Sequence, residues 1–180
     1  YITTNNTIFG TRYTSIPDTG DVPLVADMSS NILSEPMDVN KFGVIFAGAQ
    51  KNIGPAGVTV VIVRKDLLGR ANPNTPKVFD WTKMAENGSM LNTPTTYSIY
   101  MAGLCLEWLK KEGGVRVIHM RNQIKAKLLY DYLDESKLFK GTAHRDHRSI
   151  MNVTFRTDDP DTDAAFVKLA TENGLLNIKG

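Results

Sequence analysis

The first half of the chain alternates short apolar runs with polar turn residues. Within these runs the apolar and polar positions do not alternate, which is typical of strands buried on both faces of an α/β sheet. The opening run, residues 1–10, predicts one more strand that ends in a polar loop. The other predicted strands are Val22–Ala26, Val44–Ala47 and Val58–Val63.

In the second half, apolar residues recur at helical spacing. They predict one helix over Thr95–Lys111 and another over Val115–Leu133, separated by the glycine pair at 113–114. Between the last strand and the first helix lies a long polar stretch, residues 69–94, which predicts a loop. A loop of this length inside a compact domain is often functional.

The last part of the chain has a β-α-β-like pattern. Residues 151–156 (MNVTFR) predict a strand, residues 159–174 an acid-started helix that stops at glycine, and LLNIKG a final apolar run. We therefore expect a large α/β domain with a mainly parallel sheet over residues 1–114. A linking helix and the start of a smaller α+β domain would follow over residues 115–180.

Composition excludes several classes of protein. With a formal net charge of +2 and Lys and Arg scattered along the chain, nothing indicates nucleic-acid binding. The apolar stretches are too short for a membrane span, and no secretory signal is visible. The single cysteine, Cys105, fits a reducing compartment, so we expect a cytoplasmic protein. Abrupt ends at Tyr1 and Gly180 suggest a piece of a longer polypeptide.

Two candidate site residues, Asp27 and Lys51, come directly after apolar strands. In open α/β sheets, ligands bind outside the carboxyl ends of the strands, so both side chains are expected at one crevice. An acid and a lysine there suit pyridoxal phosphate (PLP). This cofactor is attached through a lysine amine and needs a carboxylate beside its pyridine nitrogen.

Other interpretations of these residues stay open at this point. An aspartate after a strand often caps a turn, and a lysine there is usually a solvated surface residue. The spacing of His144 and His147 would suit a metal, but no third ligand is evident, so we expect a solvated turn and no metal site. Cys105 and Trp108 are expected to pack in the core from the first helix.

The segments around these residues resemble one family along almost the whole chain. AGAQKNIGPAG, from Ala47 to Gly57, is similar to the cofactor-lysine segment of phosphoserine aminotransferases. VADMSSNILSEPMDVNKFGVIFAGAQKN, VVIVRKDLLG, GSMLNTPTTYSIY and LEWLKKEGG resemble the same family in the same order. The resemblance implies the fold of fold-type I PLP-dependent transferases and a homodimer with an active site shared between subunits.

The resemblance also implies a role for each matching residue. Lys51 is the catalytic lysine that holds PLP, and Asp27 is the acid at the pyridine nitrogen. Thr7 lies beside the phenolic oxygen of the cofactor, although Asn6 stands where many family members have glutamate. The remaining implied residues contact the PLP phosphate, the last two from the neighbouring subunit: Gln50, Asn92 and Thr93.

The implied reaction moves an amino group between glutamate and 3-phosphohydroxypyruvate, giving phosphoserine and 2-oxoglutarate. It belongs to serine biosynthesis and, in some bacteria, also to vitamin B6 synthesis. The arginines that bind substrate in this family have no match in this sequence. Two alternatives remain, another fold-type I PLP enzyme, such as a cysteine desulfurase, or a non-catalytic module that retains part of the site.

Overall fold

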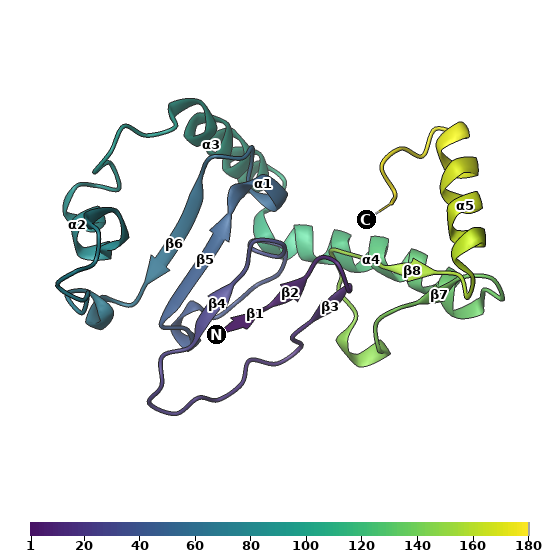
Figure 1. Cartoon of the computed structure of the whole chain (residues 1–180), viewed down its shortest axis with the longest axis horizontal. Coiled ribbons are helices and arrows are strands. Elements are labelled where there is room, and N and C mark those ends of the chain that lie inside the picture. Colours follow the sequence, from purple (N-terminus) through teal and green to yellow (C-terminus); the bar gives the residue numbers. More distant parts are fainter. Residues whose placement is uncertain (180) are drawn as a thin grey trace. The chain divides into compact units, whose positions relative to one another are not determined.

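The computed structural model describes residues 1–179 of the 180-residue chain, and these form two compact units (Figure 1). The first unit contains residues 1–4 and 15–119. The second contains residues 5–14 and the chain from Met120 onward. The long helix α4 (Gly114–Glu135) therefore begins in the first unit and continues in the second. Assignment of domains to residues 1–114 and 115–180 stays a prediction.

The first unit is built on a four-stranded sheet in the order β1-β4-β5-β6 (Figure 1). The first three strands are parallel to one another, and β6 is antiparallel to β5. This mainly parallel sheet confirms the predicted α/β class. Its strands are β1 (Ile2–Thr3), β4 (Val25–Asp27), β5 (Val44–Gly48) and β6 (Thr59–Val63).

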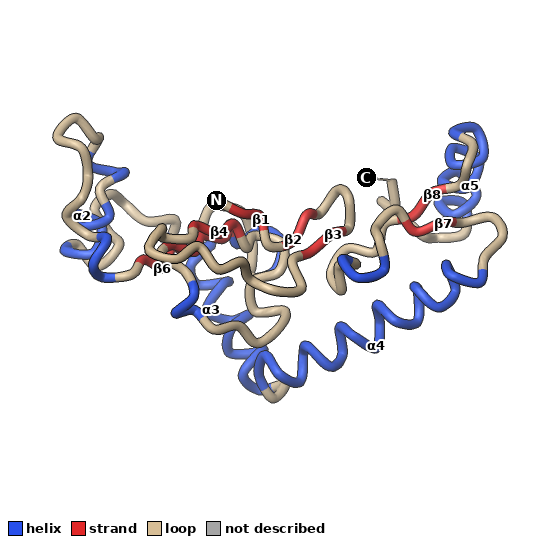
Figure 2. The backbone as a smooth tube through the Cα atoms, turned by 90° about the horizontal axis from the view of Figure 1, so that it is seen from below, coloured by secondary structure: helices blue, strands red, loops and turns tan. Residues whose placement is uncertain are grey.

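Three helices and three 3₁₀ turns complete the first unit before α4 begins. Helix α3 lies on one side of the sheet (Figure 2), and its predicted bounds are confirmed to within one residue. The helices are α1 (Ala49–Asn52), α2 (Trp81–Glu86) and α3 (Thr96–Lys111). The turns are η1 (Val39–Lys41), η2 (Lys65–Leu67) and η3 (Lys77–Phe79).

The core of the first unit forms where β4 and β5 pack against α1 and α3. Its buried residues are Leu24, Ala26, Met28, Ile32, Phe42, Ile45, Ala47, Ala49, Ile53 and Ala102. Gly54, just after α1, makes close packing with α3 possible, because a Cβ at this position would lie 3.1 Å from Ala102 Cα. The short helix α1 is thus held between the sheet and α3.

Strand β6 differs from the prediction of strands buried on both faces. Its apolar residues Val61 and Ile62 are each 43% exposed, whereas Val44 and Ile45 of β5 are buried. Apolar composition predicted the strand correctly but not its surroundings, because β6 lies at the edge of the described sheet. The prediction of burial on both faces holds for β5 and is wrong for β6.

The prediction of a continuous loop over the polar stretch of residues 69–94 is wrong. It contains η3 and α2, and the carboxylate of Asp80 caps α2 by accepting a hydrogen bond from the Thr82 amide. The cap explains how a short helix forms in a stretch rich in turn residues. Asn92 and Thr93 follow α2 and precede α3.

The second unit combines α4 with two small antiparallel pairs, β2–β3 and β7–β8, and helix α5. Its core is formed by Ala126, Tyr130 and Leu133 of α4, with aromatic rings stacked edge to face beside them. The elements are β2 (Asn5–Asn6), β3 (Thr11–Arg12), β7 (Lys140–Gly141), η4 (Arg145–His147), β8 (Phe155–Arg156) and α5 (Pro160–Glu172).

Two sequence predictions for the second unit need correction. Only Phe155 and Arg156 of the predicted strand 151–156 are in a strand, where they pair with β7. The final apolar run forms no strand over residues 175–179, and Gly180 lies outside the described residues. The opening ten residues are likewise divided between β1, β2 and the polar turn before β3.

Across residues 1–179, the helices are all too short or too polar to cross a lipid bilayer.

Candidate active site

Asp27 is the last residue of β4, at the carboxyl end of a central strand. Its carboxylate Oδ1 accepts a hydrogen bond of 2.8 Å from the backbone amide of Ser29. Its backbone carbonyl accepts a bond of 3.0 Å from the amide of Thr4. The side chain is half-buried, so the carboxylate is fixed in position but still partly open to solvent.

Lys51 lies in α1, which follows β5 directly. Ala49 and Ile53 anchor this four-residue helix in the core, whereas the side chains of Gln50 and Lys51 are exposed. The side chain of Gln50 folds back over the end of β5. Its Oε1 lies so close to Gly48 that a Cβ at this glycine would be only 2.5 Å away. The helix therefore directs the side chains of Gln50 and Lys51 away from the core.

The topology brings Asp27 and Lys51 to the same edge of the sheet. Strands β4 and β5 are parallel neighbours, with Asp27 opposite Phe46, and the chain leaves β5 into α1. Carboxyl ends of parallel strands meet at one edge, and ligands of open α/β sheets bind there. This arrangement agrees with the expectation from the sequence, while the catalytic roles of the two residues stay predictions.

Asn92 and Thr93 are exposed in the segment that leads into α3. The start of α3 is fixed to the loop after α1, where Thr95 Oγ1 donates to the carbonyl of Gly57 and Ser98 Oγ to that of Ala56, both at 2.8 Å. The segment thus belongs to the same unit as Lys51. Its exposure leaves it accessible to a second subunit, and its predicted contact with phosphate stays a prediction.

Thr7 lies in the turn between β2 and β3, which belongs to the second unit. The neighbouring Asn6 shapes this turn, since its Oδ1 accepts hydrogen bonds of 3.0 Å from the amides of Ile8 and Phe9. Asn6 therefore stabilises the turn that contains Thr7. The role of Thr7 beside the cofactor stays a prediction.

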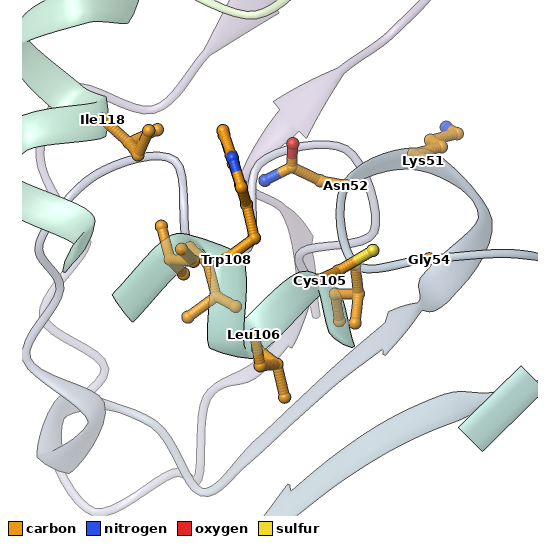
Figure 3. A pocket seen from close by; sticks show the side chains of 10 residues that line it. Lys51, Asn52, Gly54, Cys105, Leu106, Trp108 and Ile118 are labelled. Carbon is orange, nitrogen blue, oxygen red and sulfur yellow. The ribbon is translucent and has the colours of Figure 1, made fainter. Parts of the chain in front are cut away.

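An apolar groove of about 320 Å³ opens beside α1 and α3 (Figure 3). Asn52, Cys105, Trp108 and Ile118 line it, and the amine of Lys51 points away from Trp108 and Ile118 (Figure 3). Lys51 also lines this groove, whereas Asp27 does not, so the groove includes only one of these two predicted site residues. Trp108 is 54% exposed, which corrects the expectation that it packs in the core.

Three arginines of the chain are paired with aspartates. Arg64 pairs with Asp66, and both Arg145 and Arg148 pair with Asp134. The hydrogen bonds from Arg148 hold the pKa of the Asp134 carboxyl below its ordinary value. The histidine-rich turn forms η4, and no group of three potential metal ligands occurs within the described part of the chain.

Sequence reasoning missed the polar residues that support Asp27 and Lys51. The hydroxyl of Ser29 accepts a 3.0 Å hydrogen bond from the Gly48 amide, and the side-chain amide of Asn52 donates one of 2.6 Å to the carbonyl of Ile32. Both bonds join segments that are separated in sequence. Composition and periodicity carry no signal for such contacts, so only the folded structure reveals them.

Comparison with known proteins identifies the family. The architecture is that of the fold-type I PLP-dependent transferases. The model of the aminotransferase class-V family matches residues 1–174, and the chain belongs to this family. The predicted resemblance is thereby confirmed at the level of the family and its fold.

Similar proteins include phosphoserine aminotransferases from several organisms. A phosphoserine aminotransferase from Lactiplantibacillus plantarum is 56% identical over 180 residues, which is 100% of this chain and 50% of that protein. The structure of phosphoserine aminotransferase from Bacillus circulans subsp. alkalophilus matches with a TM-score of 0.95 and 44% identity, over 99% of this chain and 50% of that one. PLP-bound phosphoserine aminotransferase from Trichomonas vaginalis has a TM-score of 0.93 and 40% identity, over 99% and 51%. The chain spans about half the length of the relatives it matches.

Proposed function

We propose that this chain is part of a phosphoserine aminotransferase, which transfers an amino group between glutamate and 3-phosphohydroxypyruvate. The observation that carries this proposal is the common sheet edge of Asp27 and Lys51, at the ends of adjacent parallel strands. Identity of 56% to a protein of that name, along the whole chain, supports the choice of substrates. The pathway proposed is serine biosynthesis in the cytoplasm.

The donor groups at this edge fit PLP. Lys51 offers a primary amine for covalent attachment of the cofactor, and Asp27 a fixed carboxylate for its pyridine nitrogen. Thr7, Gln50 and the 92–93 segment are the proposed further contacts. When bound, PLP supplies an electron sink for the charge left on the substrate α-carbon.

The residues of this chain would supply binding and proton transfer. The Asp27 carboxylate keeps a proton on the ring nitrogen, because a nearby negative charge favours the protonated ring. With PLP bound, the amine Nζ of Lys51 would act as the base that takes the proton from the substrate α-carbon, and its conjugate acid would return a proton to complete the transfer. The anchoring of Ala49 and Ile53 in the core limits how far α1 can move during these steps.

The proposed enzyme is a homodimer in which Asn92 and Thr93 reach the PLP phosphate of the partner subunit. Short polar side chains are suitable donors to phosphate oxygens, and both residues are exposed. The substrate carboxylate and phosphate need arginine forks. Since Arg64, Arg145 and Arg148 are paired with aspartates, we propose that other arginines, in the part of the family's length that this chain does not span, bind substrate.

A cysteine desulfurase is a weaker candidate, because such an enzyme needs a mobile catalytic cysteine. Cys105 lies within α3, beside Ala102 of the core, where the helix holds it in place. This position favours the aminotransferase among the enzymes of the same fold.

An amino-transfer assay tests the proposal. The protein at its natural full length is loaded with PLP and given glutamate with 3-phosphohydroxypyruvate, pyruvate or oxaloacetate in turn. We expect kcat/KM to be highest for the phosphorylated acid by at least about a hundredfold, because buried cationic sites discriminate strongly against substrates that lack the charge they bind. Equal rates with pyruvate, or no amino transfer at all, would contradict the proposal.

A further inference from the structure

Two polar side chains connect the turn after β4 with α1, one at each end of that helix. At its start, the hydroxyl of Ser29 accepts a hydrogen bond of 3.0 Å from the amide of Gly48, the residue before α1. At its end, Nδ2 of Asn52 donates a bond of 2.6 Å to the carbonyl of Ile32. Lys51 therefore lies between two hydrogen bonds that join α1 to the same turn.

Ser29 also contacts the acid of the site. Its backbone amide donates a 2.8 Å hydrogen bond to Oδ1 of Asp27, while its hydroxyl receives the bond from Gly48. One residue thus touches the carboxylate on one side and the beginning of the lysine-bearing helix on the other. No side chain caps α1 at Gly48, and this end is attached by the bond to Ser29 and by a 2.9 Å bond from the Ala49 amide to the Val58 carbonyl.

The turn that receives both bonds is itself rigid. Within it, Ser34 Oγ donates to the carbonyl of Asn31 at 2.6 Å, and Asn31 Oδ1 lies 2.7 Å from the hydroxyl of Thr4. Leu33 has a φ of 62°, a conformation that non-glycine residues keep only when their surroundings enforce it. Asn52 binds the carbonyl of Ile32 immediately before this strained residue.

A helix as short as α1 has little stability of its own, so its position depends on tertiary contacts. The apolar contacts of Ala49 and Ile53 keep α1 against the core, but apolar contacts do not fix direction. Hydrogen bonds at both ends do fix it. They hold α1, and Lys51 with it, at a set position relative to Asp27.

We propose that Ser29 and Asn52 are positioning residues that fix the separation between Asp27 and Lys51 for cofactor binding. This inference rests on the proposed function. The pyridine ring of PLP is rigid, so it cannot adapt to a changed distance between the group at its nitrogen and the group at its aldehyde. Productive sites hold such groups to within about 0.5 Å, and supporting hydrogen bonds supply that precision.

The test compares variants of the full-length protein by two measurements that do not depend on turnover. These are the Kd for PLP, from titration of the cofactor-free protein, and the visible circular dichroism of bound PLP, which reports the orientation of the ring. We expect Ser29→Ala and Asn52→Ala each to raise the Kd about tenfold and to change the dichroism. Each variant loses one hydrogen bond that holds α1, and the free energy of one such bond corresponds to about a tenfold change in Kd. Ser29→Thr, which keeps the hydroxyl, should restore both values.

Ser136→Ala is the matched control. Ser136 is also half-buried, and its hydroxyl accepts hydrogen bonds from two backbone amides, those of Leu138 and Phe139, in the second unit. We expect this variant to lower the unfolding temperature slightly but to leave the Kd and the dichroism unchanged.

The outcomes distinguish a failure of the positioning role from a failure of the proposed function. If Ser29→Ala and Asn52→Ala lower the unfolding temperature as Ser136→Ala does, with the natural Kd and dichroism retained, the positioning role is overturned and the proposed function stands. If the unchanged protein itself binds no PLP, the proposed function fails and this inference fails with it.

Discussion

Asp27 and Phe46 are register partners on the parallel strands β4 and β5, and the strand that carries Phe46 leads directly into the helix of Lys51. This pairing sets the carboxylate and the amine at one edge of the sheet. Hydrogen bonds through Ser29 and Asn52 then tie the two segments together beyond the end of the sheet. The candidate site is therefore a product of sheet register and of local polar contacts.

The charge of Asp27 can be separated from its structural role by Asp27→Asn. The amide oxygen of asparagine can still accept the hydrogen bond from the Ser29 amide, so the local structure is retained. Loss of the charge at the ring nitrogen should reduce kcat for amino transfer by about 10²–10³-fold. Steady-state kinetics and thermal unfolding check this expectation, with Asp21→Asn on the exposed loop before β4 as control. If Asp27→Asn has the same kcat as the unchanged protein, the carboxylate of Asp27 has no role in amino transfer.

The close packing of α1 and α3 predicts opposite effects of two glycine substitutions. Gly54→Ala would place a Cβ 3.1 Å from Ala102 Cα and 3.3 Å from its backbone nitrogen, so the backbones must separate. The free energy of unfolding should fall by about 1–3 kcal/mol.

Gly103→Ala is the matched control, since a Cβ at this position within α3 meets nothing within 4 Å. It should raise the free energy of unfolding by up to about 1 kcal/mol, because alanine favours the helix. Urea unfolding measures both effects. Equal changes in the two variants would mean that α1 and α3 do not pack as described.

The ion pair of Asp134 with Arg148 predicts a pH-dependent stability. Arg148 donates hydrogen bonds of 2.9 and 2.6 Å to the two carboxylate oxygens, which lowers the pKa of Asp134 from its ordinary 3.8. A carboxyl with a lowered folded-state pKa stabilises the fold fully above its unfolded pKa. That contribution is lost as the pH falls through the folded-state pKa.

Asp134→Asn should therefore lower the unfolding temperature at neutral pH, and the difference from the natural protein should shrink below pH 3.8. Thermal unfolding over a pH series measures this difference. Asp131→Asn, which removes a carboxylate from an exposed pair with Lys127 on the same helix, should change the neutral-pH value little. A difference for Asp134→Asn that stays constant down to acid pH would contradict the assigned ion pair.

Local patterns in the sequence predicted most of the elements. Helical spacing was sufficient for α3 and α4, and the apolar runs indicated β4, β5 and β6 with their polar ends. Asp27 and Lys51 could be recognised as candidates because topology alone brings the carboxyl ends of parallel strands to one edge. These features depend on residues close together in the chain.

The remaining features depend on contacts between distant residues. The exposure of Val61 and Ile62 follows from the edge position of β6, which no periodicity reveals. Ser29 and Asn52 act through hydrogen bonds to Gly48 and Ile32, and polar residues in a turn carry no mark of their partners. The grouping of residues 5–14 with the second unit is equally invisible in the sequence, because it is set by contacts of β3 with the segment around Arg148.

The covalent attachment of PLP to Lys51 is the central claim, and it has a direct measurement. The full-length protein is incubated with PLP, reduced with borohydride, digested, and its peptides are mapped by mass spectrometry. The account predicts the phosphopyridoxyl group on Lys51, its absence in Lys51→Ala, and natural labelling in Lys41→Ala, whose lysine lies in the exposed turn η1. Labelling of another lysine in the natural protein, or labelling that persists in Lys51→Ala, would contradict it.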